Sequence, residues 1–349
     1  MVKINKNFWK NKKVFITGHT GFKGSWLCLW LKYLNADIMG YSLPLSKKNN
    51  LFYKLKLIDK LKNVEGDITD SKNLEKCLIK YEPDIIFHLA AQPLVIESYI
   101  NPKLTFETNI QGTVNLMNSC LNLKKLKSII VVTSDKCYEN NEIRSNFTEN
   151  DKLGGDDPYS ASKASAEIIT ASYHKSFLNN IGVATVRSGN VIGGGDNSKN
   201  RLIPDIIKSI KKNQNLILRY PESTRPWQHV FETINGYINL CEKLYKNKEY
   251  SGAWNFGPNY KKITVRDIAK KIIKISNSKV KINYKRNKFF REKNFLTLNS
   301  KKANKYLGWK NKWNIDKSIE QVVSWHFNSN KKNILKLSLN QLIDYINDK

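Results

Sequence analysis

The chain contains 349 residues, which is enough for about two domains with a substantial buried core. Apolar residues make up 40% of it and aromatic residues 11%, a composition that excludes an intrinsically disordered chain. The sequence has no run of about 18 apolar residues, so we expect no membrane-spanning helix and no membrane partner.

Basic side chains outnumber acidic ones by 59 to 30, which gives a net charge of +29. The lysines are spread in ones and twos along the whole chain, and no zinc finger or aromatic RNA-binding strand is recognisable among them. This distribution predicts a solvated basic surface that attracts small phosphorylated molecules, and no nucleic-acid partner. A polyanion-binding role stays open as the alternative.

The five cysteines are widely spaced and form no Cys-x-x-Cys pair. We therefore expect buried, reduced thiols and neither a disulfide framework nor a metal site. Residues 1–13 are polar and basic and contain no apolar signal core, so we expect a cytoplasmic protein.

The first half of the chain alternates short apolar runs with helical stretches. Apolar runs without polar alternation are typical of strands in a parallel sheet that helices cover on both faces. The expected strands are residues 13–17, 36–41, 63–67, 84–90, 128–133 and 183–187, and a helix is expected over 25–34. The repetition predicts an α/β fold with a doubly wound parallel sheet.

The second half is less regular. Residues 193–196 read as a loop, and helices are expected over 203–212, 264–276 and 315–327, the second with Thr264 as its N-cap. We expect a first domain of residues 1–188 plus about 226–257. A smaller, mixed C-terminal domain would comprise about 189–225 plus 258–349.

A glycine-rich turn lies between the first expected strand and the first expected helix. Glycines at 18, 21 and 24 allow a tight turn, a close approach to a pyrophosphate, and the use of the free N–H groups of the helix that follows. The alternative is a purely structural turn. The dinucleotide contacts predicted for this segment are Gly18, His19, Gly21, Phe22, Lys23 and Gly24.

The second expected strand ends without the acidic residue that usually binds the adenosine ribose. Ser42 is the nearest polar candidate there. Asp67 and Ile68, after the third expected strand, are placed to contact the adenine, with an ordinary turn as the alternative. The missing acid leaves the choice between NAD and NADP open.

Tyr159 and Lys163 lie four residues apart and would share one face of a helix. A tyrosine acts as a base near neutrality only if its pKa falls from about 10, and a nearby ammonium favours the phenolate. We therefore expect Lys163 to lower the pKa of Tyr159. Ser134 directly follows a buried strand, so its hydroxyl would reach the phenol or a substrate hydroxyl from the carboxyl edge of the sheet.

The glycine turn, the serine and the Tyr/Lys pair, in this order, resemble the extended branch of the short-chain dehydrogenase/reductase superfamily over nearly the whole chain. The segments 88–92 and 187–193 fit the same pattern. The resemblance implies a Rossmann-type first domain that binds NAD, with further cofactor contacts at Ala90 and Gln92. It also implies a homodimer in which helices near 100–122 and 159–178 pair.

Asp135 and Lys136 narrow the resemblance to sugar-nucleotide 4,6-dehydratases. The resemblance implies oxidation at sugar carbon 4, loss of water across carbons 5 and 6, and return of the hydride to carbon 6. Tyr159 would take the carbon-4 hydroxyl proton, and Lys163 would assist it and hold the nicotinamide ribose. Asp135 would protonate the departing hydroxyl. Lys136 is the candidate base at carbon 5, where the family commonly has Glu, and a structural or cofactor-contacting cation is the alternative.

Several long stretches look closest to the CDP-glucose 4,6-dehydratases, among them residues 18–27, 134–140, 201–205 and 225–230. This resemblance implies CDP-glucose as substrate and CDP-4-dehydro-6-deoxyglucose as product, for deoxyhexose and surface-polysaccharide synthesis. The substrate-binding residues expected, besides Ser134, are Asn190, Arg201 and Arg225. A sugar-nucleotide epimerase or reductase of the same fold is the alternative, and a non-catalytic dinucleotide-binding protein is the alternative from another class.

Overall fold

The computed structural model describes residues 4–45, 50–140, 146–259, 263–285, 296–328 and 333–348. Its centre is a seven-stranded sheet of order β11-β6-β5-β4-β1-β2-β3, in which every pairing is parallel. The predicted α/β doubly wound sheet is therefore confirmed. The strands are β1 (Lys13–Thr17), β2 (Asp37–Ser42), β3 (Lys62–Glu65), β4 (Ile85–His88), β5 (Ser128–Val132), β6 (Gly182–Ser188) and β11 (Gly252–Phe256).

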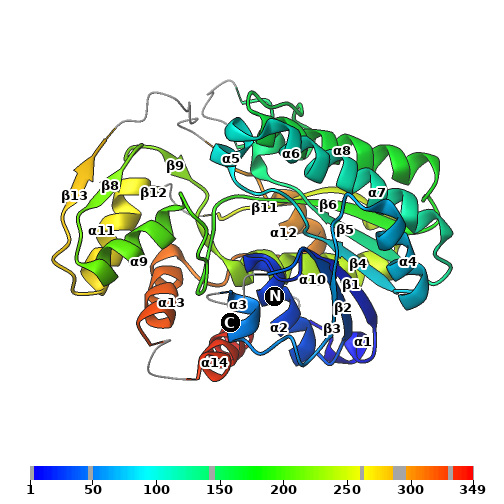
Figure 1. Ribbon diagram of the computed structural model, residues 1–349, viewed down its shortest axis with the longest axis horizontal. Coiled ribbons are helices and arrows are strands. Elements are labelled where there is room, and N and C mark those ends of the chain that lie inside the picture. The colour runs from blue at the N-terminus through cyan, green and yellow to red at the C-terminus, as the bar shows by residue number, and fades with distance from the viewer. Residues whose placement is uncertain are drawn as a thin grey trace.

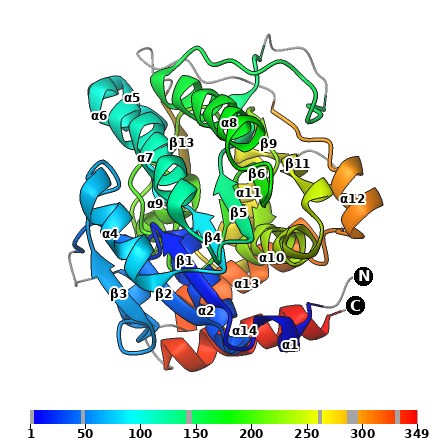
Figure 2. The ribbon, with the colours of Figure 1, turned by 90° about the vertical axis from the view of Figure 1, so that its right-hand side faces the viewer.

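Helices cover both faces of this sheet (Figure 2). One face carries α2 (Phe22–Tyr33), α10 (Val230–Lys246) and α14 (Ile334–Asn347), and its core is rich in aromatic rings such as Trp30, Phe231 and Tyr345. The opposite face carries α4 (Ser71–Tyr81), α7 (Gly112–Ser119) and α8 (Pro158–Ser176). Because both faces are buried, the strands consist of apolar runs without polar alternation.

A smaller mixed unit lies beside the carboxyl edge of the sheet (Figure 1). Three helices form its core: α9 (Leu202–Lys212), α11 (Val265–Ile275) and α13 (Ile315–Asn328). Thr264 caps α11 as predicted, in a capping box with Asp267. The strand pairs are β7 (Val191–Ile192) with β10 (Gln228–His229), β8 (Leu216–Leu218) with β13 (Ile282–Tyr284), and β9 (Thr224–Arg225) with β12 (Ile263–Thr264), the last pair antiparallel.

Two features depart from the expected elements. Helix α2 begins at Phe22 instead of Ser25, because the glycine turn ends at the N-cap Gly21 and the chain is helical from there. Strand β11 was not predicted, since Asn255 interrupts its apolar run.

The two-domain division stays a prediction. Two late helices, α12 (Lys301–Leu307) and α14, bury Leu307, Leu342 and Tyr345 in the core of the sheet domain. The remaining helices are short: α1 (Lys6–Trp9), α3 (Leu51–Lys54), α5 (Val95–Ile100) and α6 (Pro102–Phe106). None of the helices in the described ranges is both long and apolar enough to cross a bilayer.

Candidate active site

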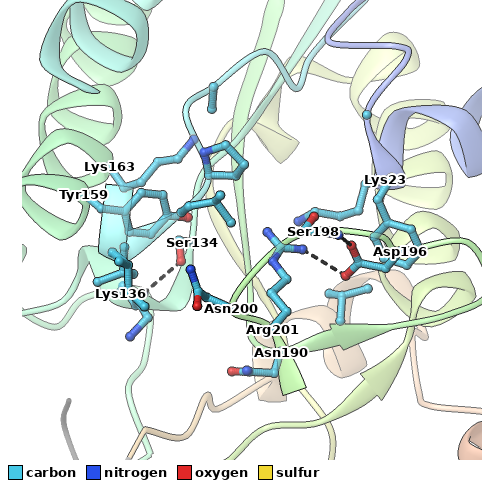
Figure 3. Close-up of a pocket in the computed structure, with 18 of the residues that line it drawn as sticks. Lys23, Ser134, Lys136, Tyr159, Lys163, Asn190, Asp196, Ser198, Asn200 and Arg201 are labelled. Atoms are coloured by element: carbon cyan, nitrogen blue, oxygen red, sulfur yellow. Dashed lines mark hydrogen bonds and ion pairs between the residues drawn. The ribbon is translucent and has the colours of Figure 1, made fainter. Parts of the chain in front are cut away.

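A cleft of about 710 Å³ runs along the carboxyl edge of the sheet and faces the smaller unit (Figure 3). Its lining includes Gly18, which directly follows β1, and Ala90 and Ser134, which lie two residues beyond β4 and β5. The strand order reverses between β1 and β4, and open α/β sheets bind their ligands at such a switch point.

The glycine turn sits at this switch point and has no room for a side chain at Gly18 or Gly24. Gly18 has φ +68°, and a Cβ on it would lie 2.6 Å from the backbone nitrogen of Ala90. A Cβ on Gly24 would lie 2.3 Å from the carbonyl oxygen of Gly18. No side chain caps the N-terminus of α2 at Gly21. The backbone N–H groups of α2 are thus available to an anion, as a pyrophosphate requires.

The other predicted cofactor residues line the same end of the cleft. Phe22, Lys23, Ser42, Asp67, Ile68 and Ala90 all belong to its wall. The hydroxyls of Ser42 and Thr20 are hydrogen-bonded at 2.8 Å, which fixes a polar group at the end of β2. Asp67 is exposed, and its Oδ1 accepts a hydrogen bond from the backbone N–H of Thr69, as in the turn that we held open as its alternative.

Two predicted cofactor residues, His19 and Gln92, are not in the cleft wall, so their contact with a cofactor stays a prediction. The His19 ring is fully buried behind β2, where its Nε2 is 2.6 Å from Asn63 Oδ1 and where any side chain on Gly40 would collide with it. The Gln92 amide donates to Thr105 Oγ1 at 2.8 Å and accepts from the N–H of Leu94. Both side chains satisfy the fold's own polar groups.

The five predicted catalytic residues all line the cleft. Figure 3 shows four of them there: Ser134, Lys136, Tyr159 and Lys163. Ser134 follows β5, and its Oγ donates to Asp135 Oδ1 at 3.0 Å and accepts from the backbone N–H of Lys136 at 3.2 Å. Tyr159 lies in the first turn of α8, which Asp157 caps. Lys163 lies one turn further along α8, and its Nζ donates to the carbonyl of Val132 at 3.3 Å.

The electrostatics of the Tyr/Lys pair differ from the prediction. Burial raises the pKa of Tyr159 to about 12, although a hydrogen bond with Ser134 works in the other direction. Burial lowers the pKa of Lys163 to about 8. The expected lowering of the Tyr159 pKa is therefore not found for the protein alone, since removal from water outweighs the opposing influences, which come from Ser134 and Arg201. A further positive charge against the phenol is needed to ionise it near neutrality.

Asp135 is buried, and that burial raises its pKa against the opposing effects of Lys136, Ser134 and Arg225. A carboxyl group in this setting holds its proton to a higher pH than an exposed aspartate and can donate it. Lys136 is half-buried in the same wall.

Cations gather on the facing wall. Removal from water, together with Lys163 and Arg201, lowers the pKa of Lys23 to about 7, and its Nζ is 3.4 Å from Ser188 Oγ. Arg201 extends into the cleft and is held by Asp196 at 3.3 Å (Figure 3). Asp196 was missed as a site residue, because an acid and a base five residues apart in a loop have no fixed geometry from sequence.

The remaining predicted substrate residues also line the cleft. Asn190 follows β6 and precedes β7, and Arg225 is buried in β9, where one Nη1 donates to the carbonyl of Thr224 at 2.8 Å. In the part of the chain that is described, no group of three His, Cys, Asp or Glu side chains could hold a metal ion.

The extended short-chain dehydrogenases/reductases surround one crevice with a glycine turn and a Ser–Tyr–Lys set, and the geometry above defines this chain as a member of that class. Comparison of the sequence with known families assigns the chain to one family within this class. The chain belongs to the GDP-mannose 4,6-dehydratase family, whose sequence model matches residues 15–322. The resemblance to the 4,6-dehydratases predicted from the sequence is thereby confirmed.

One curated relative is the CDP-glucose 4,6-dehydratase of Salmonella typhimurium, which is 42% identical over 332 residues, or 93% of this chain and 92% of the relative. A solved dTDP-glucose 4,6-dehydratase from Bacillus anthracis, in complex with NAD, is 23% identical with a TM-score of 0.79 and covers 92% of this chain and 98% of its own. A UDP-glucose 4-epimerase from Thermotoga maritima, with UDP-glucose, is 19% identical with a TM-score of 0.80 and covers 92% and 100%. Dehydratases and epimerases therefore share this fold.

Proposed function

We propose that the protein is an NAD-dependent CDP-glucose 4,6-dehydratase that forms CDP-4-dehydro-6-deoxyglucose and water. The observation that carries the proposal is the buried carboxyl of Asp135 beside Ser134 and Tyr159. Oxidation and reduction at carbon 4 need only the hydroxyl groups of Ser134 and Tyr159, whereas elimination of the carbon-6 hydroxyl needs a proton donor as well. The 42% identity to a CDP-glucose 4,6-dehydratase supports the nucleotide assignment.

The residues of the cleft fit a dinucleotide. The turn at Gly18 and Gly24 excludes side chains where a pyrophosphate would approach, and the free N-terminus of α2 supplies donors for it. Ser42 and Asp67 would meet the adenosine end, and Tyr159 and Lys163 the nicotinamide ribose. When bound, NAD supplies a hydride acceptor for carbon 4 and a hydride donor for carbon 6, and its positive ring provides the charge that Tyr159 lacks.

Each catalytic side chain then has a proton to move. Tyr159, once ionised, takes the proton of the carbon-4 hydroxyl, with Ser134 hydrogen-bonding the same oxygen. The resulting ketone acidifies the proton on carbon 5, and Lys136 is the candidate base that takes it. Asp135 protonates the hydroxyl that leaves carbon 6 as water, and the proton that Lys136 took returns to carbon 5 of the product.

The substrate's diphosphate and sugar would lie against the opposite wall. Arg201 and Arg225 offer guanidinium groups suited to phosphate oxygens, and Asn190 offers an amide. The basic composition of the chain favours the approach of such an anion.

Mass spectrometry of the purified protein incubated with CDP-glucose tests the function. We expect a product lighter by one water, without added reductant, and slower or no turnover of UDP-glucose, dTDP-glucose and GDP-mannose. Deuterium placed on carbon 4 should appear on carbon 6 of the product. An isomer of unchanged mass would instead identify an epimerase, and a requirement for external NADH would identify a reductase.

We also propose a homodimer in the cytoplasm. The helices α5, α6 and α8 expose Ile100, Leu104 and Ile168 on one side of the sheet domain, a face suited to a second copy. The five cysteines are free thiols, which suits a reducing compartment. Light scattering of the purified protein tests the dimer, and a monomer at micromolar concentration would refute it.

A further inference from the structure

A buried ion pair lies directly behind the catalytic wall. Glu167 is on α8, one turn beyond Lys163 and two turns beyond Tyr159, so the three residues follow one face of the helix. Glu167 and its partner Arg187 have side chains only 3% exposed and are 2.8 Å apart. Glu167 is absent from the cleft wall and therefore acts only through its neighbours.

The Glu167 carboxylate accepts four hydrogen bonds, one from the residue that follows β5 and three from β6. It accepts from the hydroxyl of Thr133, the residue before Ser134, and from Thr185 Oγ1 at 2.5 Å. It also accepts from Arg187 Nε at 2.9 Å and Nη2 at 2.8 Å. These bonds tie the helix that carries Tyr159 to the ends of β5 and β6 at the level of the catalytic serine.

Arg187 extends the cluster to the other side. Its Nη1 donates to Tyr138 Oη at 2.7 Å, and Tyr138 in turn donates to Asn255 Oδ1 at 2.8 Å. A buried ion pair usually gains little stability over apolar side chains of the same volume, because both charges must leave water. Stability by itself therefore does not account for a charged pair at this position.

The Glu167 carboxylate lies one helical turn from Lys163 on α8 and raises the pKa of its ammonium group. Burial lowers the pKa of Lys163 to about 8, and Glu167 is the largest influence that opposes the fall. Of the other groups that face Lys163, the Cys137 thiol acts in the same direction as Glu167. Lys23 on α2 and His88 on β4 feel the Lys163 ammonium as a repulsive charge.

We infer that Glu167 is a positioning residue for the proposed reaction: it holds α8 in register with the serine at the end of β5 and keeps the Lys163 ammonium charged. Its role rests on the proposed function only in so far as Lys163 is catalytic. The electrostatic part concerns the protein alone and is measurable without turnover.

Competitive labelling of the cofactor-free protein tests the electrostatic part. Acetic anhydride acylates only neutral amines, so the pH at which the Lys163 peptide becomes labelled reports its protonation. In Glu167→Gln we expect the labelling midpoint of Lys163 to fall by about one pH unit or more. Thr185→Val is the matched control, because it removes a hydrogen bond from the same cluster and leaves the charge, so its midpoint should stay at the wild-type value.

A second variant keeps the test valid if Glu167→Gln does not fold, because that change leaves Arg187 buried and unpaired. The double variant Glu167→Gln with Arg187→Gln removes both charges, and its midpoint should lie between those of the wild type and Glu167→Gln. Circular dichroism establishes folding. An unchanged midpoint in a folded variant that lacks the carboxylate would overturn the inference.

The pH profile of CDP-glucose dehydration provides the functional readout. The alkaline limb of kcat should move to lower pH in Glu167→Gln together with the labelling midpoint, whereas a merely structural role would lower kcat and leave the limb in place. Absence of turnover in the wild type would refute the proposed function. A shifted labelling midpoint would still support the electrostatic role.

Discussion

Replacing Lys163 by methionine should stabilise the cofactor-free fold while removing the proposed activity. Lys163 is only 6% exposed, and burial lowers its pKa from the ordinary 10.5 to about 8. Such a fall corresponds to about 3 kcal/mol that the folded protein loses by holding the charged form. The substitution also deletes the hydrogen bond to the Val132 carbonyl, which is 3.3 Å long and contributes about 1 kcal/mol. The net expected gain is about 2 kcal/mol.

The gain has a defined pH dependence. Below about pH 8 the lysine is charged in both the folded and the unfolded protein, so the full penalty is present. As the pH rises toward 10.5, the folded protein loses its proton first and the penalty disappears. The advantage of Lys163→Met should therefore be largest at neutral pH and should vanish in alkaline solution.

Urea unfolding, followed by tryptophan fluorescence across this pH range, measures the effect. Lys175→Met is the matched control, since Lys175 is exposed on the same helix and its replacement should change the stability little at any pH. A Lys163→Met variant whose free energy of unfolding falls at neutral pH, or differs from the wild type by the same amount at every pH, would refute the reasoning.

Three further substitutions test the site. Tyr159→Phe should lower the dehydration rate by about 10²–10⁴-fold, because the carbon-4 proton has no acceptor, while NAD binding by fluorescence quenching stays near the wild-type value. Full activity would reject the tyrosine as base. Asp135→Asn should still oxidise the sugar but lose water about 10²–10⁴-fold more slowly, so that the absorbance of reduced cofactor accumulates. An unchanged overall rate would remove Asp135 from the mechanism. Gly24→Ala should abolish cofactor binding in calorimetry, because its Cβ would lie 2.3 Å from the Gly18 carbonyl oxygen. Retained affinity would show that the glycine turn can adjust to the added Cβ and still bind the pyrophosphate.

The parts of the site that could be predicted from the sequence depend on short-range geometry. A strand, a glycine turn and a helix in succession specify the cofactor end of the cleft. Gly18, Gly21 and Gly24 lie within seven consecutive residues, so their spacing can be recognised from the sequence alone. Tyr159 and Lys163 share a helix face at any tertiary position, and Ser134 follows a strand whose apolar run marks it as buried. The alternation of apolar runs with helical stretches was enough to predict the doubly wound sheet, and Ser134 after a buried strand was enough to predict a crevice at its carboxyl edge.

Only the tertiary structure decided what surrounds those residues. The His19 ring packs behind β2 because Gly40, which is distant in the sequence, leaves space for it. The Gln92 side-chain amide is hydrogen-bonded to Thr105. Burial, which is a property of the packed chain, raises the pKa of Tyr159 where the local lysine alone predicted a fall.

The cluster behind the catalytic wall is a product of long-range packing as well. Glu167 finds its donors directly after β5 and on β6, and the nearest of them in the chain, Thr185, is 18 residues away. The sequence by itself therefore determined which side chains could do the chemistry, since their types and spacing are local. Folding decided their charge states, because the cost of removing a group from water depends on every segment packed against it.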